Sequence, residues 1–292
     1  FSTELFYKWW TKLYFVWLRP MVKLLFKWVT GQCELLRITY SNSCQADRVK
    51  RIGKFIHNDK SVLLCFIIFL FFFWFSKFKL FFSPLRFQIS LKDSLQRISA
   101  YNRLIVQAEN LRKTRFSSDN DDHEEKLNTL WRLYNADCLA LPCRVGHHWT
   151  EIGFQGDDPA TDFRGMGLLG LDQLIFFADI YPQQAMHVLS QSRHPQFGFS
   201  FAIVGINMTE MCVTLLKKRM FGSYIYSFEK EGSDLTDFHK IYCHIFHGFA
   251  QHWFAERPES IMEFGRVRAD YLQKVEIMLG SDETVLLSEF QQ

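Results

Sequence analysis

Apolar residues recur at the spacing of an α-helix along most of the chain after residue 90, and no segment alternates as a β-strand does. The clearest examples are SLKDSLQRISAYNRLIVQAENLRK (90–113), FSFAIVGINMTEMCVTLLKK (199–218) and LTDFHKIYCHIFHGFAQHWF (235–254). A helix with such a face buries it against neighbouring helices. The pattern therefore predicts an all-α, multi-helix domain from about residue 90 to residue 280.

Residues that favour helix ends divide this domain into segments. The run SSDNDDHEEKLNTLWRLY (117–134) opens with capping and acidic residues before it turns apolar, which is typical of a helix start. Pro182 and Pro258 each stand before a helical run, where proline suits the first turn. We predict that helices open at these two prolines and that the last one closes at Gly280.

Residues 5–29 have a different pattern, because cations and tryptophans occur together there. On a helix the five cations lie within an arc of about 100°, and most apolar side chains lie opposite. The cations are Lys8, Lys12, Arg19, Lys23 and Lys27. This is typical of a helix in a membrane interface. A core helix with one cationic face is the alternative, whereas a signal peptide is disfavoured because cations interrupt the apolar run.

Residues 61–85 form the most apolar stretch of the chain. The uncharged core, residues 62–75, has 14 residues, about 21 Å as a helix, whereas a membrane span needs about 20 residues. Lys77 and Lys79 would have to snorkel for the stretch to cross a bilayer. A single span is left open but not favoured, beside a buried core helix, a membrane hairpin with residues 5–29, and a wrongly translated stretch.

Composition narrows the class of protein. The chain has 292 residues, 48% of them hydrophobic, which is enough for a substantial core. A net charge of +3, without a basic stripe in the C-terminal half, argues against nucleic-acid binding. Seven cysteines form no CxxC pair, which favours a reducing, cytosol-facing compartment. We expect an amphipathic and hydrophobic helical region over residues 1–89 and a helical domain over residues 90–292, with a few residues missing before Phe1.

Most catalytic signatures are absent from the sequence. There is no GxGxxG, no GxSxG and no Walker lysine. A metal-dependent hydrolase would have to use two adjacent histidines and nearby acids, namely His147, His148, Glu151, Asp157 and Asp158. Histidine pairs that bind metal from a helix are spaced i and i+4, so this set fits poorly. The hydrolase stays a second alternative, and we expect no metal.

The stretch WTEIGFQGDDPATDFRGMGLLGL (149–171) contains the strongest candidate, Arg164. Pro159 and the glycines predict a turn that ends at a helix N-terminus near Gly167, so Arg164 would lie on a loop held by a rigid element. Three acids are near enough in sequence to hold its guanidinium: Asp157, Asp158 and Asp162, the last being the first choice. One interpretation is a structural salt bridge with a helix cap. The other is an arginine finger, whose planar charged fork stabilises the phosphoryl charge of a partner's GTP hydrolysis.

This stretch, with SRHPQFGFSFAIVGINMTEM (192–211) and RPESIMEFGRVR (257–268), resembles the ELMO domain. The resemblance covers about residues 119–280 and is strongest to the short ELMO domain-containing proteins that activate Arf and Arf-like GTPases. VTGQCELLRI (29–38) is similar to the N-terminal region of that family. In the family, the arginine of the DFRG sequence is held essential for activation, and it corresponds to Arg164. Residues 61–85 depart from the family, which has a more polar stretch there.

The resemblance implies a GTPase-activating protein (GAP) rather than an enzyme with its own substrate. The GTPase would bring GTP, Mg²⁺ and water, so no cofactor of the protein's own is expected. The residues expected to support Arg164 or to contact the partner are Trp149, Glu151, Gly156, Asp157, Asp158, Asp162, Gly165 and Gly167. A non-catalytic ELMO scaffold in small-GTPase signalling is the alternative function. The expected location is cytoplasmic, peripheral on intracellular membranes.

Overall fold

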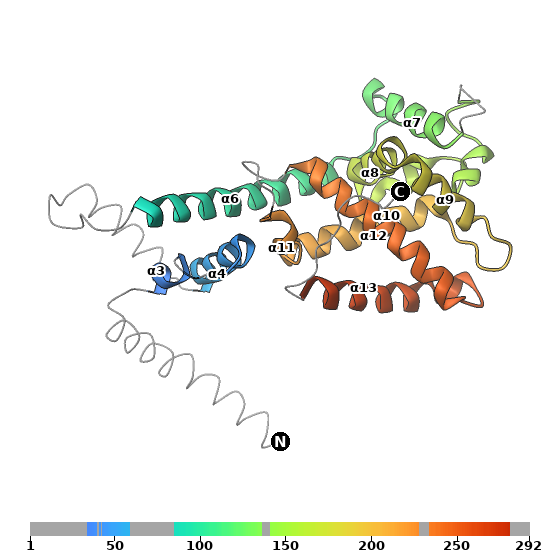
Figure 1. The fold of residues 1–292 in the computed structure, drawn as a ribbon. Helices are drawn as coiled ribbons and strands as arrows, with labels where there is room; N and C mark the ends of the chain where they lie inside the picture. The colour runs from blue at the N-terminus through green and yellow to red at the C-terminus, as the bar shows by residue number, and fades with distance from the viewer. Residues whose placement is uncertain are drawn as a thin grey trace, which may run out of the picture. The chain divides into compact units, whose positions relative to one another are not determined.

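A computed structural model describes residues 34–39, 41, 43–58, 85–135, 141–227 and 234–280 (Figure 1). Within these ranges the regular structure consists of α-helices and short 3₁₀ helices, without a β-strand. The predicted all-α fold is confirmed. The two membrane predictions concern residues 5–29 and 61–85. Residues 5–29 and 61–84 lie outside the described residues, and Leu85 begins a described helix. Of the helices that are described, none is long and apolar enough to cross a bilayer.

The chain divides into two compact units, and the boundary falls between Ile98 and Ser99, inside the long helix α6 (Leu85–Lys113). α6 therefore continues past residue 89, where the composition placed the domain boundary. The first unit contains α3 (Glu34–Thr39), α4 (Gln45–Asn58) and the beginning of α6.

In the first unit, α4 packs through one face. Its buried side chains Ala46, Val49 and Ile52 recur every three residues, as expected of an amphipathic helix. Gln45 Nε2 donates a hydrogen bond to Asp93 Oδ2 at 2.8 Å, which links α4 to the first part of α6.

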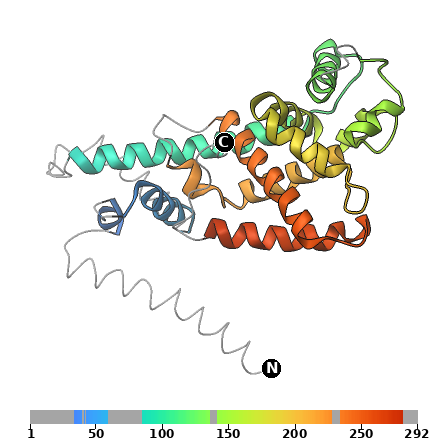
Figure 2. The same cartoon turned by 45° about the vertical axis from the view of Figure 1, so that its right-hand side comes forward.

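The second unit contains the rest of α6 and the later helices, several of which pack around α8. In chain order these are α7 (Asp121–Tyr134), η2 (His147–Ile152), η3 (Pro159–Arg164), α8 (Gly167–Ile180), α9 (Pro182–Ser192), α10 (Phe201–Lys217), α11 (Gly222–Ile225), α12 (Leu235–Glu256), η4 (Ile261–Glu263) and α13 (Phe264–Gly280). α8 contacts α7, α9, α10 and α12. Its sequence, GLLGLDQLIFFADI, is buried along most of its length, which suits a central helix. α7 and α13 lie on opposite sides of the unit in both views (Figure 1, Figure 2).

Three buried tyrosines join pairs of helices through hydrogen bonds from their hydroxyls to main-chain carbonyl oxygens. Tyr101 donates to Leu216, Tyr134 to Leu174 and Tyr271 to Ile245, each at 3.0 Å. Burial raises the pKa of all three hydroxyls, so they remain protonated donors at neutral pH. An unpaired buried hydroxyl would cost about 1–3 kcal/mol, so these bonds favour one arrangement of the helices.

Most helix ends follow the predicted signals. α7 begins at Asp121, after the cap residue Asn120, whose side chain accepts a hydrogen bond from Asp122 N. α9 opens at Pro182 and α13 ends at Gly280. These boundaries agree with the sequence because caps and proline act locally on the first turn of a helix.

Pro258 does not open the last helix, contrary to the prediction. Arg257 adopts a left-handed conformation with φ of 46° and ends α12. The hydroxyl of Ser260 then accepts a hydrogen bond from Met262 N at 3.2 Å and caps η4, so α13 begins only at Phe264. The chain uses this segment to reverse direction between two packed helices, and a proline alone does not distinguish that from a helix start.

Candidate functional site

Arg164 is the last residue of η3, the 3₁₀ helix that leads into α8. Phe163 anchors η3 because its ring is 1% exposed and lies 5.6 Å from the Phe154 ring. Asp158 caps the other end, where its Oδ1 accepts a hydrogen bond from Ala160 N at 3.0 Å. A buried anchor and a cap therefore hold the backbone that carries Arg164.

The side chain of Arg164 is exposed. Its Nε donates a hydrogen bond to the carbonyl oxygen of Thr161 at 2.7 Å. Within the part of the chain that the structure describes, no carboxylate forms an ion pair with it at 4.0 Å or less. Because the one bond uses Nε, both terminal nitrogens remain open to a bidentate acceptor such as a phosphate.

The three acids beside Arg164 have other partners. Asp162 Oδ2 accepts from Gln155 N at 2.9 Å, Asp158 Oδ1 accepts from Arg144 Nη1 at 2.8 Å, and Asp157 Oδ1 lies 3.6 Å from His147 Nδ1. Asp162 therefore does not orient Arg164, contrary to the expectation, and none of the three acids pairs with Arg164 in the described part of the chain, although Asp158 does cap η3 as the structural interpretation expected. The reason is that residues i and i+3 share a face of a 3₁₀ helix, so Thr161 lies beside Arg164 and Asp162 does not.

Arg144 connects two elements of the site, although no pattern in the sequence points to it. Its Nε pairs with Glu124 at 2.7 Å and its Nη1 with Asp158 at 2.8 Å. Its guanidinium carbon lies 5.2 Å from the centre of the Phe116 ring. Arg144 therefore joins the first turn of α7 to the cap of η3. No local pattern indicates this, because the two acidic partners lie 20 and 14 residues away in sequence.

The end of α6 supports the other side of Arg164. Gly167 has a left-handed backbone with φ of 53°, and a Cβ there would lie 2.4 Å from the carbonyl oxygens of Arg112 and Thr114. Leu168 N donates to the same Thr114 oxygen at 3.0 Å, and Arg112 Nη1 donates to the Gly165 carbonyl oxygen at 3.4 Å. Since only glycine permits this approach, Gly167 fixes the start of α8 against α6.

Glu109 pairs with two cations, one near the end of α6 and one at the end of α10. Its carboxylate pairs with Arg112 Nε at 2.8 Å and with Lys217 Nζ at 2.6 Å. The hydrogen bonds from Arg112, and then from Lys217, lower the pKa of Glu109 to about 2. Glu109 is therefore ionised at neutral pH and joins α6 to the end of α10. The spacing of Glu109 and Arg112 is common on helices, so the sequence carried no signal for this role.

Trp149 supports the site from inside the fold. It is fully buried, with its ring 5.5 Å from the Trp131 ring and 5.6 Å from the Phe154 ring. Its Nε1 donates a hydrogen bond to the Arg144 carbonyl oxygen at 3.0 Å. Trp149 is thus placed to stabilise η2 and cannot contact a partner directly.

The remaining predicted residues lie on the outer side. The Glu151 side chain is exposed, while its carbonyl oxygen accepts from Arg193 Nη2 at 2.9 Å. A Cβ added at Gly156 or at Gly165 would meet nothing within 4 Å. The fold therefore leaves room for a side chain at both glycines, including Gly165 directly after Arg164.

The residues proposed for a metal site do not converge. Among the described residues, no group of three or more His, Cys, Asp or Glu side chains is suited to hold a metal ion. His147 faces Asp157, whereas His148 Nδ1 lies 4.0 Å from Cys143 Sγ and its ring packs edge-on against Trp131 at 4.8 Å. Because the two histidines point to different neighbours, the geometry does not favour the hydrolase alternative.

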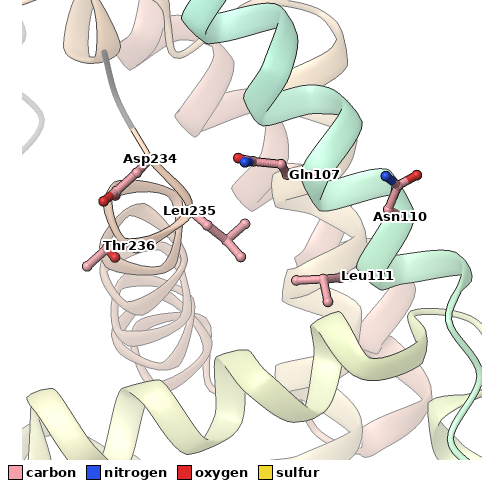
Figure 3. A pocket seen from close by; sticks show the side chains of 6 residues that line it. All are labelled: Gln107, Asn110, Leu111, Asp234, Leu235 and Thr236. Atoms are coloured by element: carbon pink, nitrogen blue, oxygen red, sulfur yellow. The ribbon is translucent and has the colours of Figure 1, made fainter. Parts of the chain in front are cut away.

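A cavity of about 440 Å³ lies between the end of α6 and the start of α12 (Figure 3). It is lined by Gln107, Asn110, Leu111, Asp234, Leu235 and Thr236. Asp234 is the only acid of this lining, and its side chain accepts from Asp237 N at 3.1 Å as the cap of α12. Since that carboxylate is engaged, the cavity offers no evident acid–base chemistry.

Comparison with known proteins identifies the same region. A sequence model of the ELMO/CED-12 family matches residues 106–268, which include the end of α6 and all of η3. ELMO domain-containing protein 2 from Homo sapiens is 43% identical over 193 residues, which cover 66% of this chain and 66% of that protein. The match to this relative therefore spans just under two thirds of its length.

Other relatives match over different lengths. ELMO domain-containing protein 1 from Bos taurus is 35% identical over 296 residues, which cover 92% of this chain and 90% of that protein. ELMO domain-containing protein B from Dictyostelium discoideum is 36% identical over 186 residues, 64% of each chain. No solved structure matches the chain.

Proposed function

The chain belongs to the ELMO/CED-12 family, and from this premise we propose that it activates Arf or Arf-like GTPases by supplying Arg164 in trans. Membership of the family supports a role connected with small GTPases. The proposal adds the class of GTPase, the reaction and the residue that acts.

The proposal rests on the exposure of the Arg164 side chain and on its single hydrogen bond. An arginine finger must present a charged fork on a backbone that does not move when the partner binds. Arg164 meets both conditions, because Phe163 and Asp158 hold η3 while the guanidinium is exposed and makes one hydrogen bond, to Thr161. An arginine with a structural role would be expected to bind a carboxylate, as Arg144 does.

The proposed chemistry is the hydrolysis of GTP to GDP and phosphate by a water molecule on the GTPase. Negative charge on the γ-phosphoryl oxygens and the bridging oxygen increases in the transition state. The terminal nitrogens of Arg164 would donate to these oxygens, while the partner provides Mg²⁺ and positions the water. Such a contribution is worth about 10³ to 10⁵ in rate, or about 4 to 7 kcal/mol of barrier.

A single-turnover GTP hydrolysis assay across a panel of Arf and Arf-like GTPases tests the proposal. We expect the wild-type chain to stimulate at least one of them, and Arg164→Ala to lose about 10³-fold of that stimulation. The melting temperature should stay nearly unchanged, because the Arg164 side chain is exposed and has one hydrogen bond. Arg132→Ala is a matched control, since Arg132 is also exposed but pairs with Glu125.

Two outcomes would contradict the proposal. Full stimulation by a folded Arg164→Ala protein would exclude the arginine finger. Tight binding of a GTPase without any stimulation would instead favour the scaffold alternative.

Peripheral membrane association through residues 5–29 stays a prediction from the sequence.

A further inference from the structure

The segment that ends α6 lies directly beside the residues that follow Arg164. The carbonyl oxygen of Thr114 accepts a hydrogen bond from Leu168 N at 3.0 Å, and Gly167 approaches it too closely for any side chain. Lys113 and Arg115 flank Thr114 in sequence, so these two cations are attached to the backbone that braces the motif. Both side chains are exposed.

Lys113 and Arg115 carry charge that the fold does not neutralise. Neither forms an ion pair or a side-chain hydrogen bond with any residue in the described ranges. The cations next to them differ, because Glu109 pairs with both Arg112 and Lys217. Lys113, Arg115 and Arg164 are therefore exposed cations on two segments that a backbone hydrogen bond joins, and none of them has an ion-pair partner among the described residues. Like charges on neighbouring segments repel one another, and an anionic partner that covers them removes this repulsion.

We propose that Lys113 and Arg115 extend the site around Arg164 into a docking surface for a partner with an anionic rim beside its nucleotide. The rim consists of acidic side chains of the GTPase and the phosphates of its bound GTP. This inference rests on the proposed function, since it describes how the same site recognises its partner. A membrane is the less favoured occupant, because lipid covering the end of α6 would also cover the segment that presents Arg164.

The two parts of this surface act at different stages. Arg164 stabilises charge that develops during hydrolysis, so its loss lowers the maximal rate. Lys113 and Arg115 attract the partner before the reaction, so their loss weakens association. Attraction between exposed charges also declines with salt, since the screening length falls from about 10 Å at 0.1 M to about 3 Å at 1 M.

The double charge reversal Lys113→Glu with Arg115→Glu tests the docking surface in the full chain. The readout is the single-turnover assay on the GTPase that responds in the panel, with the activator in excess. The half-saturating concentration should rise about tenfold at low ionic strength, and the difference should fall to about twofold or less near 0.5 M salt. The maximal rate should stay within about twofold of wild type, and the conservative pair Lys113→Arg with Arg115→Lys should behave as wild type.

A matched control reverses two exposed cations elsewhere, Arg103→Glu with Arg257→Glu. Arg103 lies ten residues before Lys113 on α6, about 15 Å along the helix. Arg257 directly follows the last residue of α12. The first turn of α12 lines the cavity beside α6 (Figure 3), and the 22 residues of α12 extend for about 33 Å, so Arg257 lies at the other end of that helix. This control makes the same change in net charge and should leave the half-saturating concentration within about twofold of wild type.

Three results would overturn the inference while leaving the proposed function intact. The first is an unchanged half-saturating concentration in the reversed protein. The second is an equal loss in the matched control, which would mean that net charge alone matters. The third is weaker binding to phosphatidylserine vesicles with unchanged kinetics in solution, which would assign Lys113 and Arg115 to lipid. If the wild-type chain stimulates no GTPase, the proposed function fails and the inference fails with it.

Discussion

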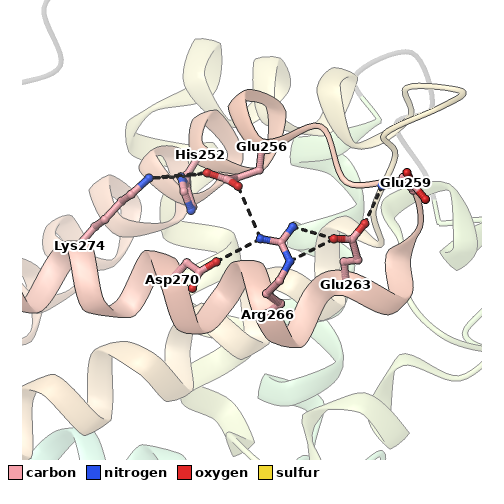
Figure 4. Close-up of polar contacts among 7 residues, drawn as sticks. All are labelled: His252, Glu256, Glu259, Glu263, Arg266, Asp270 and Lys274. Carbon is pink, nitrogen blue, oxygen red and sulfur yellow. Dashed lines mark hydrogen bonds and ion pairs between the residues drawn. The ribbon is translucent and has the colours of Figure 1, made fainter.

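Two exposed arginines in the second unit are used in opposite ways. Arg266 on α13 binds three carboxylates, Glu263 at 2.7 Å, Asp270 at 3.2 Å and Glu256 at 3.6 Å (Figure 4). Arg164 binds no carboxylate among the described residues and has one hydrogen bond, to a carbonyl oxygen. Exposure alone therefore does not tell a paired arginine from one without a counter-charge. What distinguishes Arg164 is an exposed charge without a counter-charge on a well-held backbone.

The surroundings of Arg266 explain where its charge goes. The hydrogen bond from Arg266, followed by one from Glu259 N, lowers the pKa of Glu263. Glu256 belongs to α12, so its pairing with Arg266 and Lys274 connects the two helices at the reversal that contains Pro258. The charge of Arg266 is therefore paired where α12 and α13 meet, whereas Arg164 has no carboxylate partner among the described residues.

Replacing each of the two arginines by lysine should produce the largest difference between them. Arg164→Lys keeps the charge but loses the bidentate fork, so we expect stimulated GTP hydrolysis to fall about 10²-fold or more, about 3 kcal/mol of barrier. Arg266→Lys should keep the activity within about twofold and change the melting temperature by about 2 °C or less, because exposed ion pairs contribute little. Single-turnover hydrolysis and thermal unfolding measure the two effects. Equal activity losses in both variants would mean that Arg164 has no special role.

The two glycines on either side of Met166 should differ in their effect on stability. Gly167→Ala should destabilise the fold by about 2–4 kcal/mol, because its positive φ disfavours a side chain and a Cβ would collide with the Arg112 and Thr114 carbonyl oxygens. Gly165 has φ of −81° and open space around it, so Gly165→Ala should keep the wild-type stability. Thermal unfolding should show a drop of about 5–15 °C for the first variant only. A stable Gly167→Ala protein would disprove the close approach to α6.

The smallest expected effect is the pH dependence of the stability that Glu109 contributes through its ion pairs. The pKa of Glu109 is lowered from 4.5 to about 2, so its ionised form stabilises the fold above about pH 5, and this contribution is lost as the pH falls toward 2. Glu109→Gln should therefore melt a few degrees below wild type at pH 7, and the difference should disappear near pH 2. Glu125→Gln is the control, because Glu125 is 62% exposed and its pair with Arg132 should contribute little at any pH. A difference for Glu109→Gln that is constant with pH would contradict the ion-pair account.

The sequence was sufficient for much of the fold, whereas the role of Arg164 stays a prediction. Helical periodicity predicted the all-α domain, the caps predicted the start of α7, and the glycines predicted a helix start near Gly167, where α8 begins. The partners of the acids were predicted less well. Asp162 was expected to hold Arg164, yet it accepts from Gln155 N, and Asp158 pairs with Arg144 instead. Local spacing gave no reason to choose between these partners.

The physical reason for this division is the range over which each interaction acts. Periodicity, caps and glycine conformations depend on residues within about one helical turn, so the sequence by itself determined the helices and an exposed segment around Arg164. The contacts of Arg144 with Glu124 and of Gly167 with Arg112 join residues that are distant in sequence, and they form only when α6, α7 and α8 pack together. The packing of these helices therefore pairs Asp158 with Arg144 and leaves Arg164 exposed, with no carboxylate within 4.0 Å among the described residues.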